Sequence, residues 1–476
     1  MEEKGPARDP DVAHGSEERI ADTLLREIRE RRGAVGPPNG LQRLLALEDE
    51  SAPALACGGE RPREWFKHGD WRVYAPPVEG GVGTVVASFS GADGREAALF
   101  RDAVSGRVFP PFDLATAYDL YVSEGWVAET AQRKLSPWQL DAFYRLKRFV
   151  PRKVQLAARR SLARRQQQPE FPAWPLDRSV VRLLRLFAYC TLLAQGRREA
   201  GFRWFWPDGH RAALILTHDV EEEEGFRLAL EVADLEEELG FRSSFNVGGW
   251  YPIDWGVVHE LSTRGFEIGS HGLSHDRSLF GSRKAFETQL PALRDVIDRL
   301  GASGFRSPST YRVFDWIGEL PVDYDCSMPH SDPFEPQPGG CCTLWPFFVG
   351  KVVELPYTLP QDHTLFTLLG HRTAELWLEQ ATAIEEQFGL IHCLSHPDRG
   401  YLAEPRNRAL YREFLTAMAE RHEVWKALPQ EVAAWWRQRD VGEVQAGLGT
   451  VRIDEGADVV LEPPARSLTA GRESRL

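Results

Sequence analysis

Two histidines stand four residues apart between Glu267 and Asp276, where the chain reads Glu-Ile-Gly-Ser-His-Gly-Leu-Ser-His-Asp. His271 and His275 therefore follow a short apolar run. At this spacing two imidazoles can share one helical turn and bind one metal ion. Two solvated, unrelated histidines can have the same spacing, so the pair indicates a metal site only if other possible ligands lie near it in the fold.

A carboxylate follows another apolar run, about fifty residues upstream. The run 211–217 is continuous and ends abruptly in His218-Asp219-Val220-Glu221. Such a run predicts a buried parallel strand, and functional groups gather at the carboxyl ends of such strands. Asp219 alone could equally cap the helix that follows.

Two further strand-like runs end in ionisable residues. Arg306 lies in Gly-Phe-Arg-Ser-Pro-Ser, where Pro308 favours an extended exit. His396 ends the run 390–395, where a buried histidine needs partners for both ring nitrogens. Structural needs alone seldom place such groups at four strand ends, so we expect a functional site there.

In this order the segments resemble the five motifs of the polysaccharide deacetylases of the NodB-homology superfamily, carbohydrate esterase family 4. The resemblance covers about residues 205–440. His218-Asp219 stands where the family usually has two aspartates, and the histidine pair 271/275 matches its second motif. The remaining three counterparts are Arg306-Ser-Pro-Ser309, Tyr324-Asp325-Cys326-Ser327 of the exopolysaccharide-type members, and Leu394-Ser-His396.

The resemblance implies a divalent metal ion, with zinc favoured, bound by Asp219, His271 and His275. One carboxylate and two imidazoles leave positions open for water and a substrate carbonyl, as in a catalytic site. His396 would protonate the departing amine, and Arg306 would orient or charge-balance the base. Manganese, iron, cobalt or nickel also suit these ligands.

Two alignments of this segment with the first motif of the family, here called registers, stay open, and they place the catalytic base at different residues. Direct alignment makes His218 the catalytic base and Asp219 the ligand, and we prefer it. In the second register Asp219 is the base and Glu221 the ligand, because residues i and i+2 share one face of a strand. His218 could also be a structural residue.

Three residues are predicted to bind substrate: Asp325, which could also support the site from behind, His330 and Trp345. Turn chemistry could explain the loop around His330, and aromatic residues are more often part of the core than of a sugar platform. Trp250 and Tyr357 are further candidates for stacking on sugars.

We therefore expect a metal-dependent hydrolase that removes N-acetyl groups from an amino sugar of a polysaccharide or its precursor. Two alternatives stay open: a hydrolase of small linear or cyclic amides, and a glycan-binding protein without turnover. Fold analogy cannot choose the substrate.

Composition fits this expectation. The 476 residues carry a net charge of −13, which argues against a nucleic-acid partner. No apolar stretch approaches the roughly twenty residues of a membrane span, and the first residues lack the apolar core of a signal peptide. We expect a cytoplasmic protein, with its six cysteines reduced. The oligomeric state cannot be predicted.

The alternation of apolar runs with helical patterns after Gly201 predicts parallel strands with crossover helices. Because several strand ends must meet at one ion, an irregular (β/α) barrel is favoured over an open sheet. The resemblance implies seven or eight strands. The predicted parts are 1–60, disordered; 61–204, an accessory α+β region of unknown function; 205–440, the barrel; and 441–476, an extension with a strand pair (450–453 and 459–461) and a polar tail.

A basic stretch at 145–165 stands out in the accessory region. It could touch an anionic membrane surface, which would suit a lipid-linked saccharide substrate. We favour the alternative, a solvated helix face that pairs with acidic neighbours.

Overall fold

The structure is a computed structural model. It describes residues 39–48, 55–59, 61–78, 83–91, 94, 96–127, 160–161, 163, 171–335, 337–442 and 447–465. Apart from residues 160–161 and 163, the basic stretch 145–165 lies outside these described residues, so its predicted membrane contact stays a prediction.

The largest sheet is built around strand β7 (Ala212–Val220), in which every residue is buried. Burial on both faces explains why this strand is a continuous apolar run. Within the described residues the sheet has nine strands in the order β12-β13-β11-β10-β9-β8-β7-β14, with β15 also paired to β7. The other strands are β8 (Ser244–Val247), β9 (Glu267–Ser270), β10 (Gly304–Phe305), β11 (Tyr324–Asp325), β12 (Phe347–Val349), β13 (Val352–Glu354), β14 (Leu390–Ser395) and β15 (Val424–Lys426).

The two ends of this sheet approach each other, because the chain leaving β13 hydrogen-bonds to β14. The amides of Thr358 and Leu359 both donate to the carbonyl of His392, at 3.3 and 3.2 Å. The sheet is therefore strongly curled. Its strands are parallel except for β12, which pairs antiparallel with β13. The predicted count of seven or eight regular βα units stays a prediction.

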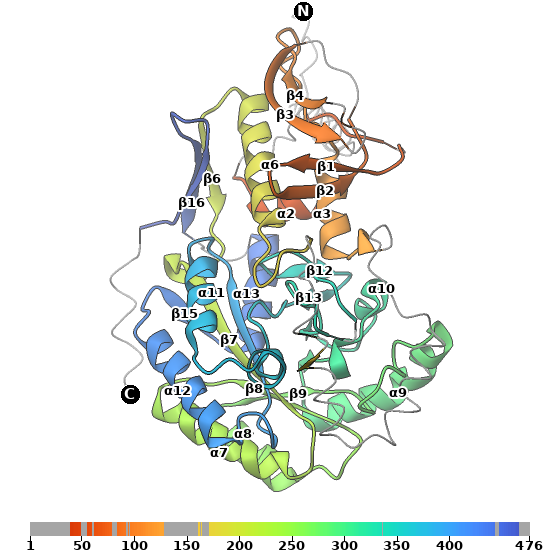
Figure 1. The fold of residues 1–476 in the computed structure, drawn as a ribbon, viewed down its shortest axis with the longest axis vertical. Helices are drawn as coiled ribbons and strands as arrows, with labels where there is room; N and C mark the ends of the chain where they lie inside the picture. Colours follow the sequence, from red (N-terminus) through yellow and green to blue (C-terminus); the bar gives the residue numbers. More distant parts are fainter. Residues whose placement is uncertain are drawn as a thin grey trace, which may run out of the picture.

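Amphipathic helices cover the outside of the curled sheet (Figure 1). In α9 (Arg283–Leu300) the buried residues are Phe286, Leu293, Ile297 and Leu300, which lie along one face of the helix. One of the helical patterns predicted after Gly201 is helix α7. The helices around the sheet are α7 (Gly225–Glu238), α8 (Trp255–Thr263), α9, α10 (Phe314–Ile317), α11 (Glu375–Glu385), α12 (Pro405–Ala419) and α13 (Pro429–Val441).

A second, antiparallel sheet lies above the first in Figure 1 and belongs to the N-terminal part of the chain. Its described strands have the order β2-β1-β3-β4-β5. The rings of Trp71, Phe89 and Phe112 pack edge to face against one another. The elements of this part are β1 (Glu64–His68), β2 (Trp71–Ala75), β3 (Thr84–Gly91), β4 (Glu96–Arg101), β5 (Val108–Phe109), α3 (Leu114–Val122) and α6 (Ser179–Gln195).

The predicted C-terminal strand pair is confirmed as β16 (Leu448–Ile453) and β17 (Val459–Glu462). It also pairs with β6 (Glu199–Arg203), so the C-terminal strands join a sheet with the N-terminal part. Within the range 1–60, for which we expected disorder, residues Gly40–Leu45 instead form helix α2. Leu41, Leu44 and Leu45 of this helix are buried in the core.

No helix in the described part of the chain is long and apolar enough to cross a membrane.

Candidate active site

The carboxyl ends of four strands bring ionisable side chains together. Asp219 lies near the end of β7, His271 follows β9, Arg306 follows β10 and His396 follows β14. Because the strands are parallel neighbours, these ends share one edge of the sheet. All four residues are buried. The prediction that these side chains gather at one place therefore agrees with the structure.

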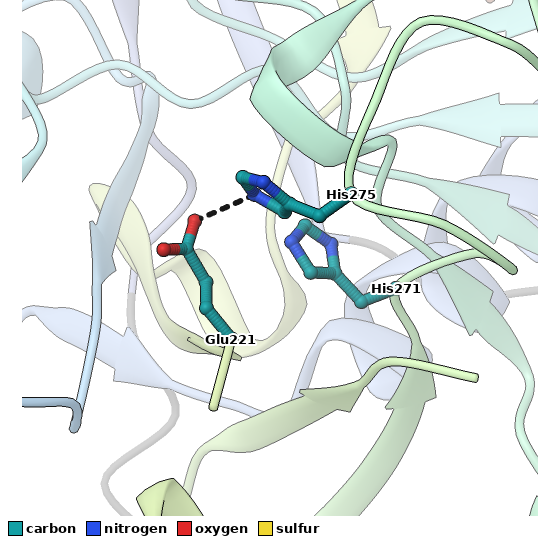
Figure 2. A group of neighbouring side chains, drawn as sticks. All are labelled: Glu221, His271 and His275. Atoms are coloured by element: carbon teal, nitrogen blue, oxygen red, sulfur yellow. Dashed lines mark ion pairs between the residues drawn. The ribbon is translucent and has the colours of Figure 1, made fainter. Parts of the chain in front are cut away.

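Three side chains form a group that could hold a metal ion: Glu221, His271 and His275 (Figure 2). Within the described residues, one possible ligand atom from each lies within 4.8 Å of the others. Nε2 of His275 is 2.8 Å from Oε1 of Glu221. The two histidines do not share a helical turn, since β9 ends at Ser270 and an irregular loop follows it.

The hydrogen bonds and the burial of His271 suit a metal ligand. Its Nδ1 lies 3.0 Å from the carbonyl oxygen of Arg306, so Nδ1 carries the proton and donates it. The lone pair is thereby left on Nε2, a buried atom without a hydrogen-bond partner among the described residues. Burial lowers the pKa of His271 to about 4, although the negative charge of Asp219 acts to raise it. A neutral imidazole with its other nitrogen fixed by a backbone carbonyl is the usual state of a metal-binding histidine.

Glu221 supplies the negative charge of the group. Burial opposes its ionisation, but the hydrogen bond and charge of His275 and the charge of His396 outweigh burial and hold the pKa of Glu221 far below its usual range. The pKa of His275 is raised, because the hydrogen bond and charge of Glu221 overcome its own burial. A carboxylate with two imidazoles is a donor set that fits a divalent ion such as zinc.

Asp219 lies beside this group. Its Oδ2 is 3.9 Å from both Nε2 of His271 and Nη1 of Arg306. Its Oδ1 accepts a 2.8 Å hydrogen bond from Asn246 on β8. The approach of Asn246 requires Gly269 on β9, because a Cβ there would lie 2.0 Å from the Asn246 amide oxygen.

These neighbours keep Asp219 ionised. Burial would raise its pKa, but His271, Arg306 and His396 together lower it below the usual value. An ionised carboxylate next to a metal group, and outside that group, can accept a proton from water.

His396 lies close to Glu221, with its Nε2 3.8 Å from Oε1 of Glu221. Its Nδ1 donates to Asp362 at 2.7 Å, and its backbone amide donates to the other oxygen of that carboxylate at 3.0 Å. Tyr401 stacks on the ring at 4.6 Å. Burial lowers the pKa of His396, but Asp362 and the carboxylates of the site outweigh burial and raise it to about 10. At neutral pH the ring is therefore protonated and can act as an acid.

His218, the base of our preferred register, does not face the site. Its Nε2 lies 2.7 Å from Oε1 of Glu236, and its Nδ1 lies 2.9 Å from the hydroxyl of Ser395. Phe245 stacks on the ring at 4.8 Å. Both ring nitrogens are occupied in the core, so the structure corrects this expectation and favours the register in which Asp219 is the base and Glu221 a ligand.

Two residues predicted to bind substrate lie in the core. Nδ1 of His330 donates to the carbonyl of Thr343, and its Nε2 accepts from the amide of Asp177. The indole of Trp345 donates to the carbonyl of Phe388. Both side chains are buried, so neither can offer a surface to a sugar. These two expectations are therefore corrected.

Asp325, the third residue predicted to bind substrate, is also buried. It accepts hydrogen bonds from the hydroxyl and the amide of Ser327. Glu354 pairs with it in register on the neighbouring strand. Burial raises the pKa of both carboxyls, and in Glu354 the charge of Asp325 adds to this.

Sequence reasoning missed the roles of two residues. Asp362 received no role, because it lies in the loop after β13 and only the fold brings it to His396. Asn246 gave no signal, because only the register of β7 against β8 places it opposite Asp219. Trp250, a candidate for sugar stacking, packs half-buried at 5.5 and 5.3 Å from the rings of His271 and His275.

No family model and no curated protein matches the chain. Among solved structures, the chain is similar to a protein assigned as a polysaccharide deacetylase from Mycobacterium smegmatis, at 19% identity and a TM-score of 0.41, over 49% of this chain and 93% of that one. An allantoinase matches at 17% identity and a TM-score of 0.40, over 49% and 92%. A peptidoglycan deacetylase from Bacillus subtilis matches at 13% identity and a TM-score of 0.33, over 50% and 97%. At these values the similarity decides no activity.

Proposed function

We propose that the chain is a metal-dependent hydrolase that removes N-acetyl groups from an amino sugar of a polysaccharide or its precursor. The observation that carries the proposal is the group Glu221, His271 and His275, with Asp219 near His271 and His396 near Glu221. Hydrolysis of an amide needs a base for water and an acid for the amine, and these two residues have the corresponding protonation states.

Glu221, His271 and His275 would hold a divalent ion, with zinc the first choice. Such an ion supplies Lewis-acid chemistry at the substrate carbonyl and lowers the pKa of a water molecule. The free lone pair on the buried Nε2 of His271 supports this assignment, since a buried acceptor left without a partner is costly.

The remaining steps belong to the chain. Asp219, held by Asn246 and charge-balanced by Arg306, takes a proton from the attacking water. The carbon–oxygen bond forms and the amide carbon–nitrogen bond breaks. His396, held by Asp362, gives its Nε2 proton to the departing amine, and the products are acetate and a free amino sugar.

The order of the five sequence motifs supports the choice of an N-acetylated sugar over other amides. The test is acetate release from N-acetylated oligosaccharides by protein loaded with zinc, with small linear and cyclic amides assayed in parallel. We expect acetate release by the wild type, and its loss in His396→Ala with the metal retained. A wild type that binds no metal, or that cleaves only the small amides, would overturn the proposal.

A further inference from the structure

Behind the site, Thr217, Arg306 and His392 form a buried polar chain whose purpose the proposed reaction leaves unexplained. Nε2 of His392 lies 2.9 Å from the hydroxyl of Thr217 and 3.3 Å from Nη2 of Arg306. The same Nη2 donates to the Thr217 hydroxyl at 3.1 Å. All three side chains are buried.

The donor and the acceptor in these hydrogen bonds can be assigned from the contacts of Nδ1, the second nitrogen of the His392 ring. Nδ1 lies 3.1 and 3.2 Å from the carbonyl oxygens of Leu355 and Pro356, which can only accept, so Nδ1 carries the proton. Nε2 is therefore an acceptor. The Thr217 hydroxyl donates to it, and the oxygen of this hydroxyl remains free to accept from Arg306.

His392 also stays uncharged. Burial, and secondly the charge of Arg306, lower its pKa to about 3. A neutral acceptor beside a guanidinium can anchor it without adding a second positive charge to the site.

The Tyr357 ring packs against the Arg306 guanidinium, with its centroid 5.6 Å from Cζ, but the hydrogen bonds of the guanidinium lie at one end. Its Nη2 is bound to Thr217 and His392, whereas its Nε and Nη1 have no hydrogen-bond partner among the described residues. Nη1 stops 3.9 Å from Oδ2 of Asp219, beyond the 2.7–2.9 Å typical of a closed charge-assisted hydrogen bond. A guanidinium released from its anchor could rotate toward Asp219 and close that gap.

We propose that His392, together with Thr217, is a positioning residue that holds the Arg306 guanidinium beside Asp219 and prevents it from closing into a direct ion pair. Asp219 then keeps a free oxygen for the water proton. The proposal rests on the proposed function only for its kinetic consequence, because the anchoring of Arg306 can be measured without substrate.

The kinetic test combines His392→Phe and the near-isosteric Thr217→Val with Arg306→Met. His330→Phe is the matched control, since His330 is a buried histidine with the same proton arrangement but a place in the core. We expect His392→Phe and Thr217→Val to lower kcat by roughly 10- to 100-fold, as for misplacement of a catalytic group. KM and metal content should stay unchanged, and His392→Gln, which keeps an acceptor, should restore most of the rate.

In the Arg306→Met background neither change should lower kcat further, because the residue through which His392 and Thr217 act is gone. His330→Phe should lower the melting temperature but leave kcat unchanged. Equal losses of kcat in both backgrounds, or an equal loss in His330→Phe, would overturn the proposal.

A second measurement needs no turnover. In ¹⁵N spectra of arginine side chains, the signals of Arg306 are identified by their absence from the spectrum of Arg306→Lys. We expect two separate Nη resonances for Arg306 in the wild type, because an anchored guanidinium does not rotate freely. In Thr217→Val we expect one averaged resonance. An averaged resonance already in the wild type would refute the anchor. A wild type with two resonances that hydrolyses none of the amides would refute the proposed function instead.

Discussion

At the scale of single residues, the alternation of side chains along β7 determines which group can act as the base. Neighbouring residues on a strand point to opposite faces, whereas residues i and i+2 share one. Asp219 therefore faces the site with Glu221, and His218 faces the core, where it contacts Glu236 and Ser395. The two adjacent ionisable residues cannot both serve the site.

This alternation predicts opposite effects for two neighbouring substitutions. Asp219→Asn removes the base, so we expect acetate release to fall by roughly 10²- to 10⁴-fold while the protein stays folded and keeps its metal. His218→Asn leaves the buried Glu236 carboxylate poorly paired, which should cost about 1–3 kcal/mol of stability or more, with most of the activity retained. The measurements are initial rates and urea unfolding of both variants; a large rate loss in His218→Asn with normal stability would contradict the assignment.

At the scale of elements, the turn between β7 and α7 is fixed from a distant part of the chain. The carboxylate of Asp398, just beyond β14, accepts from the backbone amides of Glu221 and Glu222 at 2.9 and 3.0 Å. Gly225 permits this approach, because a Cβ there would lie 2.4 Å from an Asp398 oxygen. Glu221, the proposed ligand, is thereby connected to the segment that follows β14 and carries His396.

Weakening the hydrogen bonds between Asp398 and the amides of Glu221 and Glu222 should weaken metal binding. Asp398→Asn replaces one acceptor by a donor that faces a backbone amide, and we expect about 10- to 100-fold lower zinc affinity, as for other partners of metal ligands. Asp254→Asn is the control, because Asp254 also accepts from two backbone amides, at the start of α8. Titration with a competing chelator gives both affinities; equal affinities of the two variants would rule out a role for Asp398.

Local sequence patterns predicted the strands around the site but only part of the site itself. Continuous apolar runs identify β7 and β14 because both faces of these strands are buried. The side of the strand on which a residue lies cannot be predicted from such a run, so our preferred register placed His218 in the site, whereas its ring contacts Glu236 and Ser395 in the core. His330 was misassigned for another reason, since its partner Asp177 lies 153 residues away in the sequence.

At the scale of the whole molecule, buried charged groups join segments that are far apart in the chain. Arg439 on α13 donates to the carbonyls of Arg43, Leu44, Arg203 and Trp204. Arg312 makes an ion pair with Glu124, which joins the curled sheet to the end of α3. Neither contact has a local sequence signal, so the attachment of the N-terminal part could not be predicted.

Glu267 makes the stability of the molecule depend on pH. Its carboxyl contacts the Tyr324 hydroxyl and accepts from the Gln430 amide, which joins β9, β11 and α13. Burial raises its pKa from 4.5 to about 7, despite these hydrogen bonds. Between these two values the folded state holds a proton that the unfolded state has released, so the stability contributed by this group is full below the lower value and is lost as the pH rises toward 7.

We therefore expect Glu267→Gln, which cannot ionise, to lose this part of the pH dependence. Near pH 5 the variant and the wild type should unfold with similar free energies. Near pH 8 the variant should be more stable than the wild type by about 3 kcal/mol, from roughly 1.4 kcal/mol per pKa unit. Urea unfolding at the two pH values provides the comparison, and a variant-to-wild-type difference that is the same at both would contradict the prediction.

In the proposed metal site, Glu221 and not Asp219 is the carboxylate that joins His271 and His275. The most direct test is the metal content of the purified wild type, Glu221→Gln and Asp219→Asn, each dialysed against the same zinc buffer. We expect about one zinc per chain in the wild type and in Asp219→Asn, and loss of zinc in Glu221→Gln, because a catalytic zinc site uses about three protein ligands. Retention of zinc by Glu221→Gln together with its loss from Asp219→Asn would contradict this assignment and restore Asp219 as the ligand.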